Sequence, residues 1–268
     1  MPCGTTAPRM IRRDGSAGDA DYGVIGEGYA RHRRPDPRIA AHISAALGDA
    51  QSVLNVGAGA GSYEPEDRIV TAVEPSGTMR GQRPAHLPRA IDAVAEKLPF
   101  PDRQFDASMA TFTVHQWADL GRGLAEMRRV TRGPVVVLTC DPALLDRFWL
   151  NDYAPEVVAT EALRYPAIAA IAAAIGASAE VVNVPIPLDC TDGFNEAYYG
   201  RPERLLDPDA RRACSSWSLV GAEAAGRFVA RLRSDLDDGS WDRRHGHLRS
   251  QAWFDGPLRL VVGHPGTA

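Results

Sequence analysis

Three glycines and one carboxylate are the residues of this sequence whose types and spacing first suggest chemistry. Gly57, Gly59 and Gly61 follow the apolar run at residues 52–56, and Glu74 ends the next apolar run. Glycine allows a tight turn and a close backbone approach to a ligand, and a strand-end carboxylate can accept hydrogen bonds from two ribose hydroxyls. The separation between Gly57 and Glu74 is close to the roughly 20 residues expected of such a turn. The pattern predicts a nucleotide-like ligand; the alternative is an ordinary tight turn.

Apolar runs alternate with helical patterns along the chain. Strands are predicted over five runs in the first half, of which the third is the weakest: 52–56, 69–74, 90–95, 105–113 and 134–140. Two more are predicted at 180–188 and 257–263. Helices are predicted at 36–49, at 119–131, in pieces over 143–176 with breaks near Pro155 and Pro166, and at 223–236. This order predicts an α/β fold with a mostly parallel sheet and a helical insertion before the last strand.

Four segments of different character divide the chain. Residues 1–20, rich in Gly, Ala, Ser, Thr and Pro, are expected to form a flexible tail. Residues 21–188 are expected to form an N-terminal cap and the cofactor-binding core, and residues 189–256 a helical substrate lid. Residues 257–268 supply the final strand of the core.

Composition argues against several classes of function. The chain has 268 residues, 44% of them hydrophobic, and a formal net charge of −4, which favours neither nucleic acid nor an anionic membrane as a partner. No run approaches the ~20 apolar residues of a membrane span. Four scattered cysteines without a CxxC pair suggest no zinc site and fit a reducing compartment. We therefore expect a cytoplasmic protein without a metal, since His245 and His247 lack a nearby acid cluster.

Four motifs in a fixed order carry a resemblance to a known family. They are VLNVGAGAG (53–61), AVEPSGTM (72–79), AEKLPFPDRQFD (95–106) and LAEMRRVTRG (124–133). Over residues 36–140 the chain resembles the class I S-adenosylmethionine-dependent methyltransferases, in the branch related to small-molecule and quinone methyltransferases. The resemblance implies a Rossmann-like, doubly wound sheet, S-adenosyl-L-methionine as cofactor and S-adenosyl-L-homocysteine as product.

The resemblance also implies roles for individual positions. The loop would pass under the methionine and ribose, Glu74 would hold the ribose, and other residues would border the adenine or the reactive methyl. The cofactor-binding residues implied are Tyr29, Asn55, Gly57, Ala58, Gly59, Gly61, Glu74, Pro75, Met79, Ala95, Glu96, Thr111 and Phe112. Two departures are regarded as subfamily variation: Asn55 stands where the family often has an acid, and residues 131–134 replace the usual Pro-Gly-Gly turn.

The segment after the glycines bears on which cofactor is bound. A phosphate-binding loop uses the amino end of a regular helix, but Ser62–Arg68, with Pro65 inside it, allows about two distorted turns at most. Glu64 and Glu66 would be poor neighbours for a pyrophosphate. Both features favour the cationic, phosphate-free S-adenosylmethionine over NAD.

Candidates for the chemistry lie beyond the fourth predicted strand and in the N-terminal cap. His115 is the first choice for a general base, because its ordinary pKa near 6.5 suits proton removal at neutral pH; a histidine satisfied by backbone is the alternative. Tyr22 is a second catalytic candidate and would close the site together with Tyr29. Arg31 or Arg34 would reach a substrate carboxylate, unless this stretch is simply a solvated basic surface.

Aromatic residues in three places, one of them with an arginine, suggest a substrate wall. The candidates are Trp117, Tyr153, Tyr198, Tyr199 and Arg201, and they mildly favour a planar or apolar small-molecule acceptor. Packing within a helical cap is the competing interpretation for each of them.

Other activities stay open on the sequence alone. An NAD-dependent oxidoreductase would use the same glycine pattern, and a non-catalytic cofactor-binding member or a cyclase would reuse the same fold. Nucleic-acid methylation is disfavoured because there is no basic stripe. The acceptor atom (oxygen, nitrogen or carbon) and the oligomeric state are not determined.

Overall fold

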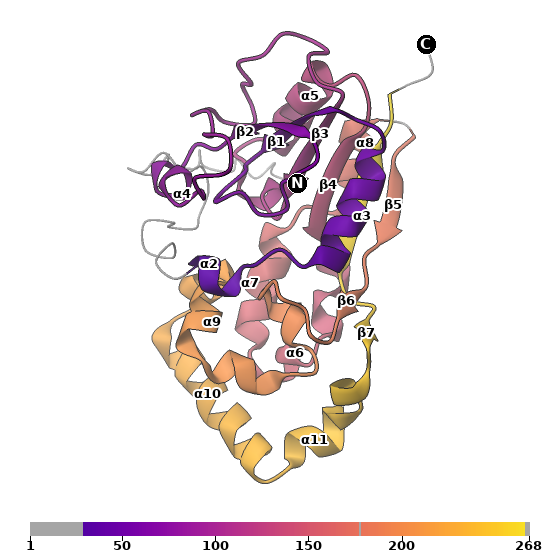
Figure 1. Ribbon diagram of the computed structural model, residues 1–268. Coiled ribbons are helices and arrows are strands. Elements are labelled where there is room, and N and C mark those ends of the chain that lie inside the picture. The colour runs from indigo at the N-terminus through magenta and orange to yellow at the C-terminus, as the bar shows by residue number, and fades with distance from the viewer. Residues whose placement is uncertain (1–28, 177, 266–268) are drawn as a thin grey trace, which may run out of the picture.

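The computed structural model describes residues 29–176 and 178–265. Figure 1 shows a sheet-containing core in the upper half and a lobe of short helices beneath it. The predicted flexible tail and Tyr22 lie outside the described residues. For Tyr29 only the backbone, in helix α2 (Tyr29–His32), is described.

One six-stranded sheet forms the core, in the order β2-β1-β3-β4-β8-β5. Its strands are β1 (Ser52–Val56), β2 (Ile69–Val73), β3 (Ala107–Thr111), β4 (Val135–Cys140), β5 (Glu180–Asn183) and β8 (Leu258–Gly263). The strands β2, β1, β3 and β4 pair in parallel, whereas β8 is antiparallel to both of its neighbours. All residues of β4 are buried, as expected for a strand covered on both faces. The prediction of a mostly parallel, Rossmann-like sheet closed by a late strand is confirmed.

Two predicted strands differ from what forms. Residues 90–95 make only an isolated parallel bridge between Val73 and Ile91. Ile91 is exposed, so this edge of the sheet is not buried under apolar side chains. Pro88, three residues earlier, also lacks the backbone N–H that a regular strand would need for pairing. The predicted strand 180–188 divides into β5 and the short β6 (Ile186–Pro187). Pro187 lies in a separate two-stranded sheet with β7 (Trp253–Phe254).

Helices cover both faces of the sheet with apolar sides. On one face, α3 (Pro37–Leu47) begins at its N-cap Asp36 and contributes Ile39, Ile43 and Leu47 to the core. On the other, α5 (Leu120–Val130) and α8 (Ile168–Ile175) pack together over a second buried cluster. A five-residue helix, α4 (Gly77–Gly81), follows β2.

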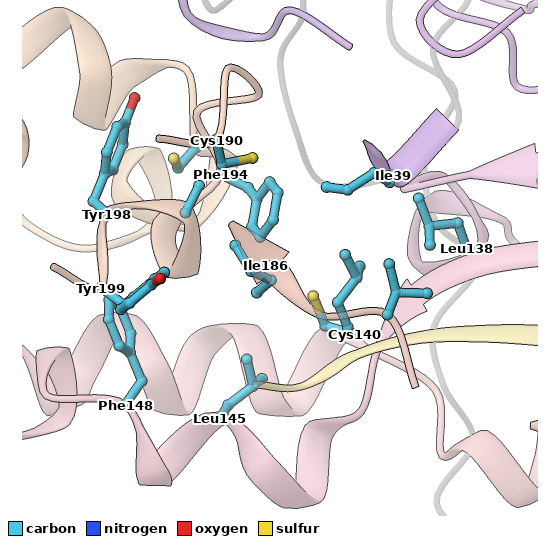
Figure 2. Packing of buried hydrophobic residues seen from close by; sticks show 14 of the residues in the cluster. Ile39, Leu138, Cys140, Leu145, Phe148, Ile186, Cys190, Phe194, Tyr198 and Tyr199 are labelled. Atoms are coloured by element: carbon cyan, nitrogen blue, oxygen red, sulfur yellow. The ribbon is translucent and has the colours of Figure 1, made fainter. Parts of the chain in front are cut away.

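The lobe below the sheet is built from short helices that share one core with α3 and β4. Figure 2 shows Ile39 and Leu138, from these two elements, together with Phe148 and Tyr199 from the lobe in one cluster. The elements of the lobe are η2 (Pro142–Arg147), α6 (Leu150–Tyr153), α7 (Pro155–Arg164), η3 (Asn195–Tyr198), η4 (Pro202–Leu206), α9 (Pro208–Arg212), η5 (Ser215–Leu219), α10 (Ala222–Asp237), α11 (Ser240–His245) and η6 (Gly246–Ser250). Residues 142–164 therefore pack with residues 195–250.

One stretch contradicts the expectation that no run is long and apolar enough for a membrane span. Pro155–Ile175 meets that test by length and composition, with a mean hydropathy of 1.4. Its two halves are separate helices, α7 and α8, because Tyr165 is extended ahead of Pro166. They pack on different clusters of the protein, so the match is weak evidence for a membrane.

Trp241 provides a test of the lobe's packing. It is fully buried and meets Trp149 edge-to-face at a centroid distance of 5.7 Å. Trp241→Ala is expected to lower the free energy of unfolding by about 3–5 kcal/mol, because it leaves a large cavity. Chemical denaturation measures this, with Trp253→Ala as the control, since Trp253 is 49% exposed. Equal losses in the two variants would contradict the packing described.

Candidate active site

The glycine loop runs in left-handed backbone conformations beyond the end of β1. Gly57, Gly59 and Gly61 have φ values of 70°, 53° and 98°. A Cβ on Gly57 would lie 2.1 Å from Oγ1 of Thr113, so glycine is required here by both conformation and space. The loop thus packs directly against the chain that follows β3.

Glu74 holds this loop in place. Its Oε2 accepts a hydrogen bond from the Gly59 amide at 2.8 Å, and its Oε1 accepts one from the Ser76 amide at 2.8 Å. The residue is 7% exposed, and burial raises the pKa of its carboxyl against the effect of these two bonds. A carboxylate retains further lone pairs after accepting two bonds, so Glu74 is able to accept from a ligand's hydroxyls as well.

No helix forms after the glycines, and a buried ion pair takes its place. Glu64 accepts hydrogen bonds from Arg83 at 2.9 and 2.8 Å and from Nδ2 of Asn55 at 3.0 Å. The side chains of Glu64 and Arg83 are 1% and 4% exposed. Glu64 and Glu66 were expected to be poor neighbours for a pyrophosphate, but neither lines the first cavity, so they give no such selection against NAD. Arg83 neutralises Glu64, and Glu66 is exposed outside the first cavity.

A first cavity opens at the carboxyl ends of β1, β2 and β3. Most of the residues expected to bind the cofactor line it: Gly57, Ala58, Gly59, Glu74, Pro75, Met79, Ala95, Glu96, Thr111 and Phe112. Trp117, expected on the substrate side, lines the same cavity. Its ring packs over Gly123 of α5, where a Cβ would lie 2.5 Å from it.

Two expected cofactor residues do not line this cavity. Asn55 is fully buried within β1 and supports Glu64 instead. Gly61 faces Leu87, whose Cδ1 would lie 2.2 Å from a Cβ at that position. Both residues therefore support the glycine loop without lining the cavity.

Phe112 stands between the first cavity and a second one. Its φ of 51° is unusual for a residue other than glycine, and such strain is typical of functional sites. Its ring packs on Phe194 at 5.3 Å, and the Arg33 guanidinium lies 5.1 Å from its centroid. Phe112 and Arg33 line both cavities.

Arg33 is fixed by an ionic junction with the lobe. Its Nε donates to Oδ1 of Asp192 at 2.5 Å, and the Tyr63 hydroxyl donates to Oδ2 at 2.9 Å. Arg31 and Arg34, the arginines expected to reach inward, are exposed. Residues 33 and 192 are paired by an isolated antiparallel bridge. This pairing directs the Arg33 side chain inward, in place of the side chains of Arg31 and Arg34.

The second cavity is small and lies between the end of β3 and the lobe. His115 lines it and lies 4.6 Å from the Tyr165 ring, centroid to centroid. Polar residues of α7 and of the segment 194–196 form much of the wall, above all Glu161, Asn195 and Glu196.

Two carboxyl groups are buried in this wall. Oε1 of Glu161 accepts hydrogen bonds from Nδ2 of Asn195 and from the Ser216 hydroxyl, both at 3.0 Å. Burial raises the pKa of Glu161, and burial together with the charge of Glu161 raises the pKa of Glu196 to about 8. The two acids therefore interact electrostatically.

Four residues expected to form the substrate wall lie elsewhere. The Tyr153 hydroxyl donates to Asp235 at 2.8 Å, and the Tyr199 hydroxyl donates to the Gln251 carbonyl at 2.5 Å. Tyr198 is buried in the lobe, and Arg201 donates to the carbonyls of Cys190 and Ala197. Within the described residues none of these four lines either cavity.

Histidines near the end of the lobe do not form a metal cluster in the described part of the chain. Nε2 of His245 lies 3.4 Å from Oδ2 of Asp152, and no group of three or more metal-ligating side chains occurs between residues 29 and 265, residue 177 aside.

Sequence reasoning missed several residues of the two cavities, namely Arg33, Gln116, Glu161, Tyr165, Asn195 and Glu196. Gln116 had a usable signal, because it stands between His115 and Trp117. The others come from the lobe and from a bridge to it, and no local spacing in the sequence marks them.

Comparison with known proteins agrees with this geometry. The sequence profile of a methyltransferase domain matches residues 54–137. A solved structure from Anabaena variabilis, described as a methyltransferase from an antibiotic biosynthesis pathway, is 30% identical with a TM-score of 0.81. The match covers 87% of this chain and 99% of that one. A methyltransferase structure from Thermotoga maritima is 16% identical over 90% of this chain and 95% of that one, with a TM-score of 0.54, and supports the fold alone. No curated protein sequence matches the chain.

An open sheet with a glycine loop and a carboxylate at its carboxyl edge defines a cofactor-binding fold of the class I methyltransferase type. The chain belongs to the S-adenosylmethionine-dependent methyltransferases. S-adenosylmethionine fits the first cavity, because the glycine loop lines one side of it at Gly57 and Gly59 and Glu74 offers acceptors for a ribose. The alternative of an NAD-dependent oxidoreductase is excluded by this membership.

Glu74 offers a direct test of this cavity. Glu74→Ala is expected to weaken binding of S-adenosylhomocysteine about 10- to 100-fold, because it removes the ribose acceptor and frees the Gly59 amide. Isothermal titration calorimetry measures the change, and Glu66→Ala, at an exposed site in the neighbouring segment, is the matched control. Unchanged affinity in Glu74→Ala would overturn the assignment.

Glu196 makes stability depend on pH. Its pKa is about 8 in the folded protein and near 4.5 when unfolded, so the folded chain binds the proton more tightly. Its stabilising contribution is complete below about pH 4.5 and is lost as pH rises through 8. The fall in unfolding free energy between pH 5 and 8, measured by urea denaturation, is expected to be smaller in Glu196→Gln. Glu203→Gln, at an exposed carboxyl, should keep the wild-type slope; an unchanged slope in Glu196→Gln would contradict the assignment.

Proposed function

We propose that this protein transfers the methyl group of S-adenosylmethionine to a small-molecule acceptor whose reacting group enters the second cavity. One observation carries the proposal. The second cavity adjoins the cofactor cavity at Phe112 and Arg33, at the carboxyl end of β3, where the resemblance puts the reactive methyl. Two ligands bound in adjoining cavities would meet at that point.

The chain's own residues would align and enclose the reactants. S-adenosylmethionine, when bound, supplies a methyl group already activated by a sulfonium. Glu74 and the glycine loop would orient the ribose, and Trp117 and Met79 would close the apolar sides of the cavity. Phe112, held by Phe194 and Arg33, would fix the line between acceptor and methyl and limit access of water.

His115 is proposed as the group that accepts the acceptor's proton. Its position on the second cavity supports this role, because a base must lie beside the acceptor rather than beside the cofactor. The tyrosine ring packed against it would keep the imidazole oriented.

The walls of the second cavity bear on the nature of the proposed acceptor. The tyrosines that favoured a planar or apolar acceptor pack within the lobe, so that preference loses its support. The second cavity is polar, which favours a small acceptor with a polar reacting group. A role in biosynthesis is supported by the relative from an antibiotic biosynthesis pathway.

A reducing compartment such as the cytoplasm is proposed as the location. Three cysteines, Cys140, Cys190 and Cys214, are buried free thiols, which suits an environment that does not form disulfides.

His115→Ala is expected to lower turnover by about 10²–10⁴-fold, the usual contribution of a general base, while binding of S-adenosylhomocysteine stays the same. Transfer of radiolabelled methyl groups to fractions of a metabolite extract measures turnover, and calorimetry measures binding. His247→Ala, at an exposed site outside both cavities, is the control. Equal turnover in the two variants would remove His115 from the mechanism.

A further inference from the structure

We propose that Gln116 binds the adenine of S-adenosylmethionine through both ends of its side-chain amide. Its Oε1 would accept a hydrogen bond from the 6-amino group, and its Nε2 would donate one to a neighbouring ring nitrogen. This inference concerns the cofactor cavity alone, so it does not rest on the proposed acceptor site.

The side chain of Gln116 is buried without satisfying its polar atoms. The residue ends the short helix η1 (Val114–Gln116), and its backbone amide donates to the Thr113 carbonyl at 2.8 Å. It is 5% exposed and lines the first cavity. Within residues 29–176 and 178–265 neither Nε2 nor Oε1 has a hydrogen-bond partner, and no other side chain there has two such buried atoms.

A buried amide without partners is destabilising, and a ligand that pairs with both of its atoms removes that cost. Buried polar side-chain atoms in folded proteins nearly always have a partner. Because Gln116 lies on a cavity, a bound molecule is able to supply the missing partners. An amide places a donor beside an acceptor, so the ligand has to present an acceptor beside a donor.

The walls of the cavity indicate which part of the cofactor meets this requirement. Past Glu74, which faces the ribose, the lining is apolar and includes Met79 and Ala95. Trp117, the residue after Gln116, borders the same region, because a Cβ at Gly123 would lie 2.5 Å from its ring and 3.2 Å from Cβ of Ala95. Such walls suit the faces of a planar base, whose edge then needs hydrogen-bonding groups.

The chemistry of adenine matches the Gln116 amide. Adenine carries an amino donor next to a ring-nitrogen acceptor, and a glutamine amide pairs with both at once. The amino-acid end of the cofactor carries an ammonium and a carboxylate, which pair more strongly with charged groups than with a neutral amide. The adenine edge is therefore the better partner for Gln116.

A crystal structure of the full chain with S-adenosylhomocysteine tests the contact directly. Oε1 and Nε2 of Gln116 are expected within hydrogen-bonding distance of the 6-amino group and of a ring nitrogen. An amide that contacts the amino-acid end instead, or that still has no partner when the ligand is bound, would overturn the proposal.

Two nucleosides that differ only in the 6-amino group, adenosine and purine riboside, test recognition of the base. In competition with S-adenosylhomocysteine, the wild type is expected to bind adenosine about tenfold more tightly than purine riboside, because only adenosine donates to Oε1. Gln116→Leu is expected to lose most of this preference. Gln104→Leu, at an exposed site outside both cavities, is the matched control and should keep it. An unchanged preference in Gln116→Leu would refute the inference.

Thermal stability separates a binding role from a structural one. Gln116→Leu removes polar atoms that have no partner in the unliganded protein, so its melting temperature is expected to equal or exceed that of wild type. Its affinity for S-adenosylhomocysteine is expected to fall about tenfold in calorimetry. A variant that melts well below wild type, or that binds S-adenosylhomocysteine as tightly as wild type, would show that the amide does not serve the cofactor.

Discussion

The carboxylate of Asp192 joins the three parts of the molecule on which the active site depends. Its two oxygens accept from Arg33 in the N-terminal segment and from Tyr63 beyond the glycine loop, while its own backbone belongs to the lobe. A second carboxylate, Asp36, accepts a hydrogen bond from the Thr191 amide, next to Asp192. Burial alone would raise the pKa of Asp36, but the hydrogen bonds from Arg38 and Thr191 lower it to about 2. Because both cavities share Arg33 as a wall, the junction fixes how the two cavities face each other.

The cofactor half of the site was largely predictable from sequence because its residues are local to strand ends. Gly57, Glu74 and Thr111 each follow or end a parallel strand, and parallel strands bring their carboxyl ends to one edge. The main differences there came from side-chain direction. Asn55 donates to Glu64, and Glu64 pairs with Arg83, so neither side chain lines the first cavity.

The second cavity, the proposed acceptor site, was not predictable in the same way. Glu161 and Glu196 are far apart in the chain and meet only when α7 packs beside η3 in the lobe. Aromatic residues drew attention to positions such as Tyr199, yet large aromatic side chains are also what a lobe of short helices needs for its core. Composition alone does not distinguish a substrate wall from such packing.

The position of β8 has a consequence for synthesis of the chain on the ribosome. This strand lies between β4 and β5 and is hydrogen-bonded to both, although it follows the whole lobe in sequence. Until residues 258–263 emerge, β4 has an open edge and β5 has no strand to pair with. Nascent chains are thus exposed to wrong strand pairing for as long as the lobe takes to be made, which is a window in which a chaperone would be useful.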